Sequence, residues 1–200
     1  MFDPIALMRP NIRALKPYSS ARSEFAGVGE VFLDANENAF GSPAGFGMNR
    51  YPDPQQIALK VRVADLLKVS PEQIFFGNGS DEAIDLLLRI FCIPGEDKII
   101  ICPPTYGMYR VAADINDVSV KEVPLTRKFQ LDVPAILRSV TQQTKIIFIC
   151  SPNNPTGNLM KCDSIVEISE NFDGVVVVDE AYIHFSSQRS SIELISDYPN

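Results

Sequence analysis

Long apolar runs, basic clusters and histidine are scarce in this sequence of 200 residues. No apolar run approaches the ~18 residues that would suggest a membrane span. The start, Met1-Phe2-Asp3-Pro4, lacks the basic segment and apolar stretch of a secretory signal. The net charge is −7, and an acidic chain with no basic run lacks the electrostatic footprint of nucleic-acid binding. We therefore expect neither a membrane nor a nucleic acid as partner.

Cysteine and histidine are also too few and too scattered to indicate a metal centre. The four cysteines, Cys92, Cys102, Cys150 and Cys162, have no metal-ligand spacing, and the single histidine, His184, cannot complete a zinc site with them. Three of the cysteines follow apolar runs. All four are better interpreted as reduced, buried thiols of a cytoplasmic protein. The hydrophobic content of 46% is typical of a globular protein.

The chain does have a regular alternation of strand-like and helix-like segments. Short apolar, β-rich segments predict strands over 74–76, 98–102, 118–123, 145–150 and 175–179. Helical periodicity and capping signals predict helices over 55–68, 80–91, 106–114, 132–140 and 161–171, with a single capped turn over 70–73. This alternation predicts an α/β fold with a mainly parallel sheet covered by helices. Polar alternation places 118–123 nearer an edge of the sheet.

Polar side chains follow two of the expected strands. Residues 145–150 stop at the turn Ser-Pro-Asn-Asn-Pro-Thr-Gly, and residues 175–178 run into Asp-Glu-Ala-Tyr. Two parallel strands joined by a helical crossover would put Asn154, Asp179 and Tyr182 at one edge of the sheet, where such folds bind ligands. An aspartate can hold a protonated ring nitrogen, and an asparagine and a tyrosine can hold a phenolic oxygen. This set fits pyridoxal 5'-phosphate (PLP).

The segment Gly-Asn-Gly-Ser-Asp-Glu, residues 77–82, lies between an expected strand and an expected helix. Glycines allow close approach to the backbone, and amides at a helix start attract phosphate. Ser80 can add a hydroxyl donor, whereas Asp81 can serve a phosphate only through its backbone amide. In isolation most such segments are plain turns, here with Ser80 as the N-cap.

These motifs, together with Lys-Pro-Tyr at 16–18, Leu-Asp-Ala-Asn-Glu-Asn at 33–38, Asn-Arg-Tyr-Pro-Asp-Pro at 49–54 and Cys-Pro-Pro-Thr-Tyr-Gly-Met-Tyr at 102–109, occur in one order. In that order the chain resembles the first part of the fold-type I PLP-dependent aminotransferases of class I/II, and within them the histidinol-phosphate aminotransferase family. Residues 1–29 are poorly periodic and contain three prolines, which indicates an N-terminal arm, and the resemblance implies a large PLP-binding domain over 30–200. This domain is incomplete at its C-terminus, and the small C-terminal domain is absent.

The resemblance also implies an activity and further site residues. The reaction would be transamination of L-histidinol phosphate with 2-oxoglutarate, in histidine biosynthesis, by a cytoplasmic homodimer. Tyr106 would pack its ring against the cofactor pyridine, with Tyr109 as the second candidate for that role. Tyr51 would bind the cofactor phosphate of the neighbouring subunit, and Tyr18 and Asn36 would line the substrate side.

A lysine that forms the Schiff base with PLP is implied by the resemblance, but it is expected beyond Asn200. The 200 residues therefore contain no catalytic residue of their own and are predicted to be inactive alone. Two other interpretations stay open at this point. One is another aminotransferase, or a PLP-dependent decarboxylase, of the same fold. The other is a non-catalytic binding module with the PLP fold.

Overall fold

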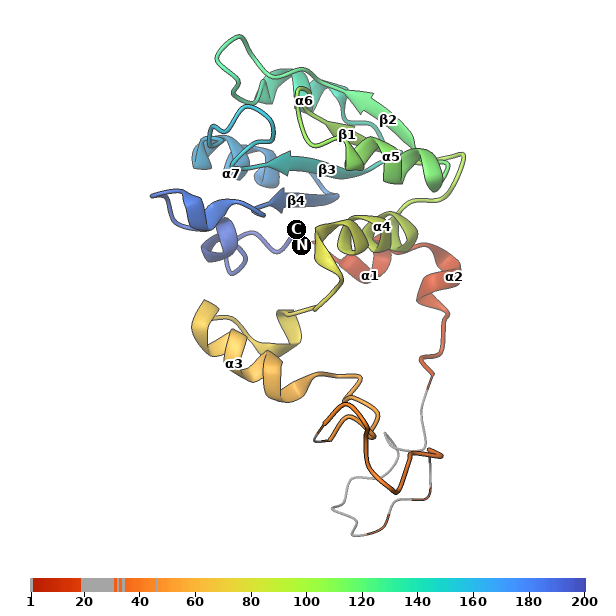
Figure 1. Ribbon diagram of the computed structural model, residues 1–200. Coiled ribbons are helices and arrows are strands. Elements are labelled where there is room, and N and C mark those ends of the chain that lie inside the picture. Colours follow the sequence, from red (N-terminus) through yellow and green to blue (C-terminus); the bar gives the residue numbers. More distant parts are fainter. Residues whose placement is uncertain (1, 19–30, 32, 34, 46) are drawn as a thin grey trace. The chain divides into compact units, whose positions relative to one another are not determined.

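The computed structural model describes residues 2–18, 31, 33, 35–45 and 47–200 (Figure 1). The chain divides into two compact units, which are described separately below. One comprises Met1–Ala14 and Gly77–Asn200, and the other comprises Leu15–Phe76. The expected division into an arm over 1–29 and a domain over 30–200 stays a prediction. In the described part of the chain, no helix is long and apolar enough to cross a membrane.

The first unit contains a four-stranded sheet. Its strands are β1 (Lys98–Ile101), β2 (Ser119–Glu122), β3 (Thr144–Cys150) and β4 (Val175–Asp179). They lie in the order β2-β1-β3-β4, and every neighbouring pair is parallel. The parallel α/β architecture expected from the sequence is thus confirmed, and β2 lies at an edge as its polar alternation predicted.

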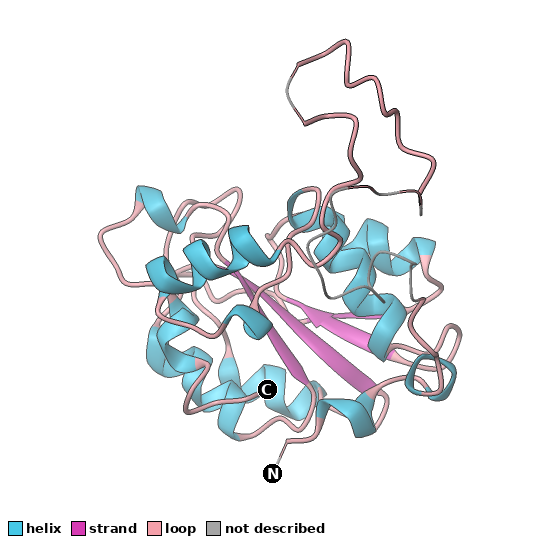
Figure 2. Ribbon diagram, turned by 90° about the horizontal axis from the view of Figure 1, so that it is seen from below, coloured by secondary structure: helices cyan, strands magenta, loops and turns pink. Residues whose placement is uncertain are grey.

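Helices cover both faces of this sheet (Figure 2). On one face, α4 (Gly79–Phe91) and α5 (Met108–Ile115) form a core with Ile99 and Phe148. On the other face, α6 (Val133–Ser139) and α7 (Cys162–Glu170) form a core with Ile100 and Ile149. Successive strand residues point to opposite faces. A strand buried on both faces must therefore be apolar throughout, which is why 145–150 shows no alternation.

The first residues of the chain pack against α4. They form α1 (Pro4–Leu7) and α2 (Pro10–Arg13), and Leu7 contacts the core shared by α4 and α5. Between these two short helices, the Arg9 backbone nitrogen donates to the Ile90 carbonyl at 2.9 Å, and Arg9 Nη1 donates to the Arg89 carbonyl at 2.9 Å. Carbonyls in the last turn of a helix lack partners within that helix. Arg9 supplies partners for two of them.

The second unit contains α3 (Ile57–Leu67) and the short helix η1 (Pro71–Gln73). The capping box expected over 70–73 is present. At the start of α3, the Asp53 carboxylate accepts hydrogen bonds from the backbone nitrogens of Ile57, at 2.9 Å, and Gln55, at 2.8 Å. The hydrogen bond from Ile57 has the largest effect and that from Gln55 the next, and both lower the pKa of Asp53. The helix is shorter than the expected 55–68 because Gln56 and Lys68, at its two ends, adopt left-handed conformations.

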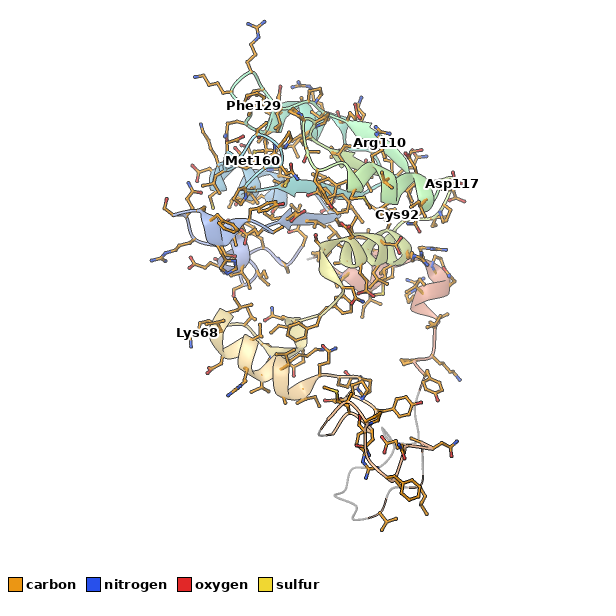
Figure 3. The ribbon with its side chains drawn as sticks, viewed as in Figure 1. Lys68, Cys92, Arg110, Asp117, Phe129 and Met160 are labelled. Carbon is orange, nitrogen blue, oxygen red and sulfur yellow. The ribbon has the colours of Figure 1, made fainter. Side chains whose placement is uncertain are left out.

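Two sequence-based expectations are wrong. Residues 74–76 form no strand, and Phe75 is 61% exposed. Three apolar residues cannot form the hydrogen bonds of a sheet without a neighbouring strand. In the described part of the chain, no strand pairs with residues 74–76. Cys162 is an exposed thiol at the start of α7, whereas Cys92, Cys102 and Cys150 are buried. Cys92 is labelled in Figure 3, and burial raises its pKa to about 12.

Candidate cofactor site

The loops after β1, β3 and β4 meet at the carboxyl edge of the sheet. Cys150 and Asp179, the last residues of β3 and β4, are paired in register, and the Ser151 nitrogen donates to the Asp179 carbonyl at 2.9 Å. Asn153 Nδ2 donates to the Pro104 carbonyl at 2.9 Å, which ties the loop after β3 to the loop after β1. The first asparagine of the Asn-Asn pair therefore stabilises the loops. The second, Asn154, makes no such contact between the loops with its side chain.

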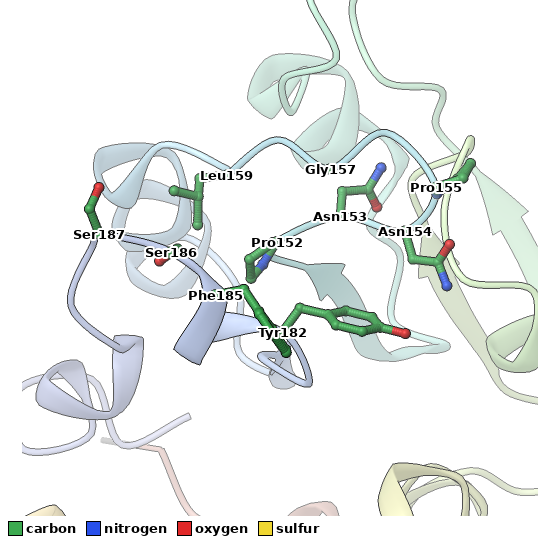
Figure 4. Close-up of a pocket in the computed structure, with 10 residues that line it drawn as sticks. All are labelled: Pro152, Asn153, Asn154, Pro155, Gly157, Leu159, Tyr182, Phe185, Ser186 and Ser187. Atoms are coloured by element: carbon green, nitrogen blue, oxygen red, sulfur yellow. The ribbon is translucent and has the colours of Figure 1, made fainter.

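A pocket of about 550 Å³ lies between the loop 152–159 and residues 182–187 (Figure 4). Asn154 and Tyr182 both line it, and Figure 4 shows their polar ends extending to the same side. Neither the Asn154 amide nor the Tyr182 hydroxyl has a hydrogen-bond partner among the residues that the structure describes. Both groups are therefore available to a ligand, and their expected role of donating to a phenolic oxygen stays a prediction.

Asp179 is held by two donors at the end of β4. The Tyr109 hydroxyl donates to Asp179 Oδ2 at 2.6 Å, and the Ala181 nitrogen donates to Oδ1 at 3.1 Å. A carboxylate offers about four acceptor positions on its two oxygens. Asp179 can therefore still accept a hydrogen bond from a protonated ring nitrogen while keeping both protein donors.

Tyr109, on α5, lies in the core that this helix forms with the sheet. It is fully buried, and its ring stacks on Phe148 with the centroids 4.8 Å apart and the planes 14° apart. Burial, followed by the hydrogen bond to Asp179, raises the pKa of Tyr109, so the hydroxyl stays protonated and acts as the donor. A buried ring stacked on Phe148 has no face free for a ligand. This excludes Tyr109 as the residue that packs on a cofactor ring and leaves Tyr106 as the remaining candidate.

Tyr106 connects this edge of the sheet to the start of α4. Its hydroxyl donates to Asp81 Oδ1 at 3.0 Å, and this bond raises the pKa of Tyr106. Its ring meets Tyr109 edge to face, with the centroids 5.6 Å apart. The segment with Ser80 and Asp81 therefore lies beside the loop after β1, so the structure brings the expected phosphate segment together with the expected ring contact.

The N-terminus of α4 is arranged as a helix start without a side-chain cap. Asn78 is the N-cap residue but makes no capping hydrogen bond with its side chain. Gly79 has φ +75°, a left-handed conformation that favours glycine. The Glu82 carboxylate accepts from the Asn78 nitrogen at 2.5 Å, and Asp81 is held by Tyr106. Both acidic side chains thus have donors of their own, and the uncapped helix start can attract a phosphate.

The remaining predicted site residues, Tyr51, Tyr18 and Asn36, belong to the second unit, so their place in the site stays a prediction. Tyr51 is 72% exposed and Tyr18 is 92% exposed. Glu37, which the sequence analysis did not single out, accepts from Arg50 Nη1 at 2.6 Å and from the Tyr51 nitrogen at 2.8 Å. It joins the segment that carries Asn36 to the turn that carries Tyr51.

Glu180, Lys98 and Lys145 of the first unit are not expected to bind the cofactor. Glu180, next to Asp179, accepts hydrogen bonds from the Ser190 hydroxyl and from the Ser191 nitrogen, so it holds the following loop. Lys98 opens β1, and Lys145 is the second residue of β3. Lys145 Nζ lies 3.7 Å from an Asp97 carboxylate oxygen. Both lysines therefore lie at the amino end of the sheet, opposite the pocket.

Comparison with known proteins gives three principal findings. Residues 30–200 match the model of the family "Aminotransferase class I and II". The chain is 57% identical over its whole length to a histidinol-phosphate aminotransferase of Cytophaga hutchinsonii and spans 57% of that relative's length. The crystal structure of the histidinol-phosphate aminotransferase from Clostridium acetobutylicum superposes with a TM-score of 0.63 at 25% identity, covering 74% of this chain and 44% of that one.

A second structure, that of cystalysin from Treponema denticola, contains PLP. It has a TM-score of 0.56 at 24% identity, covers 66% of this chain and 36% of its own, and therefore shows the shared fold alone. The family match, in contrast, covers most of the chain, including the segments that carry Ser80, Tyr106, Asn154 and Asp179. The chain belongs to the aminotransferase class I and II family.

Proposed function

We propose that these 200 residues are the cofactor-binding part of a longer histidinol-phosphate aminotransferase. It would transfer the amino group between L-histidinol phosphate and 2-oxoglutarate. The main support is Asp179 at the carboxyl end of β4, together with Asn154 and Tyr182, which line one pocket and have no side-chain hydrogen-bond partner in the described structure. The identity of 57% to the Cytophaga hutchinsonii relative supports the substrate assignment. The four free thiols suit a cytoplasmic protein.

The class I and II aminotransferases use PLP, and the residues at this edge of the sheet fit that cofactor. Asp179 has spare acceptor positions, as a pyridinium N–H requires. Asn154 and Tyr182 supply donors without partners of their own in the described structure. The uncapped start of α4 at Ser80 supplies amides for a phosphate. Anionic, phenolic and cationic parts of the cofactor thus each have a matching group.

When bound, PLP supplies a ring that withdraws the electron pair left on the substrate carbon as its proton is removed. Asp179 would hold the proton on the ring nitrogen, because an opposite charge within ~4–6 Å favours the charged form. Asn154 and Tyr182 would donate to the phenolic oxygen and orient the ring. Tyr106 would pack against the ring face, where an aromatic pair contributes roughly 0.5–1.5 kcal/mol beyond area burial.

The experiment that tests this proposal starts from the reading frame that contains these residues. We expect the frame to continue past Asn200 and to encode a lysine soon after it. The full-length protein should form glutamate from 2-oxoglutarate and L-histidinol phosphate, faster than from aromatic amino acids. A frame that stops at Asn200, or a purified full-length protein that binds PLP and prefers another amino donor, would contradict it. The second result would favour another aminotransferase of the same fold.

We also propose that the full-length enzyme is a homodimer in which Tyr51 reaches the neighbouring subunit's phosphate. This can be tested with hybrid dimers made from a Tyr51→Phe subunit and an Asp179→Asn subunit. If Tyr51 acts across the interface, one of the two sites in each hybrid keeps both wild-type residues, and the hybrid retains about half of the wild-type activity. If Tyr51 acts within its own subunit, both sites carry a defect and the hybrid is as weak as its parents.

A further inference from the structure

We propose that Tyr109 is a positioning residue, which fixes the Asp179 carboxylate so that it can hold the ring nitrogen of the cofactor. This inference rests on the proposed function. Tyr109 lies on α5 and Asp179 at the end of β4, 70 residues apart in sequence, and their side chains form a hydrogen bond of 2.6 Å. Tyr109 is thereby the link between the helical layer and the group that is expected to act on the cofactor.

The Tyr109 hydroxyl has a fixed place because the ring has no freedom to move. The ring is 0% exposed, is stacked on Phe148, and meets Tyr106 edge to face. Tightly packed side chains stay in one rotamer. The hydroxyl is consequently a donor at a fixed position, and it fixes the orientation of the Asp179 carboxylate that accepts from it.

The two donors on Asp179 come from different directions in the chain. The Ala181 nitrogen binds Oδ1 from within the same loop, whereas Tyr109 binds Oδ2 from the helix below. With one donor on each oxygen, rotation about the last side-chain bond would break both hydrogen bonds. With Ala181 alone, the carboxylate could turn about a single contact. The hydroxyl of Tyr109 therefore restricts the Asp179 carboxylate to one orientation at the end of β4.

The test compares Tyr109→Phe with Tyr198→Phe in the full-length enzyme. Both changes remove one phenolic hydroxyl that donates to a carboxylate, but Tyr198 donates to Glu170 at 3.3 Å on the exposed surface. The apo-enzymes are loaded with pyridoxamine 5'-phosphate labelled with ¹⁵N in the ring, and the ¹⁵N shift is followed against pH. The dissociation constant for PLP and the separate kcat and KM values complete the comparison.

We expect Tyr109→Phe to weaken PLP binding about tenfold, the size expected for one hydrogen bond to a charged group. We also expect the ring nitrogen to lose its proton at lower pH than in the wild type, and kcat to fall more than KM rises. Tyr198→Phe should match the wild type in all three. A merely structural role for Tyr109 would lower stability without moving the titration of the ring nitrogen.

Two outcomes overturn the inference. One is a Tyr109→Phe enzyme that titrates like the Tyr198→Phe control. The other is a ring nitrogen that holds its proton to higher pH, because then the lost donor would only have left Asp179 a better acceptor. If Tyr109→Phe fails to fold, Phe148→Leu loosens the ring stacking but keeps the hydroxyl, and it should give a smaller shift of the same sign. A wild-type protein that binds no PLP would instead refute the proposed function.

Discussion

Replacing Asp179 by asparagine should separate its charge from its place in the fold. Asparagine has the same shape and keeps one oxygen, so it can still accept from the Ala181 nitrogen or from the Tyr109 hydroxyl. What it cannot do is stabilise a positive charge on the cofactor ring. The change Asp179→Ala does not separate the two effects, because it also removes the acceptor of the buried Tyr109 hydroxyl.

The contacts set the expected sizes of the two effects. A hydrogen bond to a charged group contributes roughly 1.5–3 kcal/mol, so Asp179→Asn should weaken PLP binding by about 10- to 150-fold. Turnover should fall further, since the protonated ring nitrogen is most needed as the substrate proton leaves. Asp179→Ala should in addition lower the free energy of unfolding of the apo-protein by about 1–3 kcal/mol, because the Tyr109 hydroxyl is left buried without a partner.

Equilibrium dialysis of the full-length apo-enzyme against PLP measures the affinity, and urea unfolding measures the stability. Glu180→Gln is the matched control, since it removes one negative charge from the adjacent residue, which holds the loop at Ser190 and Ser191. If Asp179→Asn kept PLP affinity and turnover within a few-fold of that control, the assignment of Asp179 to the ring nitrogen would be wrong.

Three further outcomes are expected. Tyr51→Phe should weaken PLP binding of the full-length enzyme by about 10- to 150-fold, while unfolding of the apo-protein stays unchanged; equal affinity in mutant and wild type would contradict it. At pH 8 the native chain should react with a thiol reagent quickly at Cys162 alone, because burial raises the pKa values of the other three thiols, and Cys162→Ser should abolish the fast phase. Asp132→Ala should lower the free energy of unfolding by ~1 kcal/mol, since the Asp132 carboxylate accepts from the Ala135 nitrogen at 3.0 Å at the start of α6. Asp132→Asn should keep most of the stability that this cap provides. An unchanged urea midpoint in Asp132→Ala would show that the cap contributes nothing.

Local patterns were sufficient to predict the elements of the first unit and the edge of the sheet that carries the site. The run 145–150 is apolar at every position after its lysine, which is typical of a strand covered on both faces, and β3 has that environment. Strands of one direction place their carboxyl ends at one edge. The sequence alone therefore predicts that Asn154 and Asp179 lie at the same edge of the sheet, and the ends of β3 and β4 are paired in register.

Contacts between distant segments could not be predicted in this way. The apolar run 74–76 has the composition of a strand, yet strand formation depends on a neighbour that the run itself does not encode. Cys162 follows Lys161, not an apolar run like those before the other three cysteines, and it falls at the exposed start of α7. Glu37 and Tyr51 are 14 residues apart, and their hydrogen bond forms only because the chain between them turns back, which neither local segment reveals.

The hydrogen bond between Tyr109 and Asp179 illustrates the same limit within the site. The sequence shows a tyrosine one helical turn after Tyr106 and indicates no more than a possible contact with the cofactor. The tertiary structure buries that ring on Phe148 and directs its hydroxyl to Asp179. Residue types and their spacing along one segment determined which groups could act. The packing of α5 against β3 and β4, a sum of many long-range contacts, decided which of them meet.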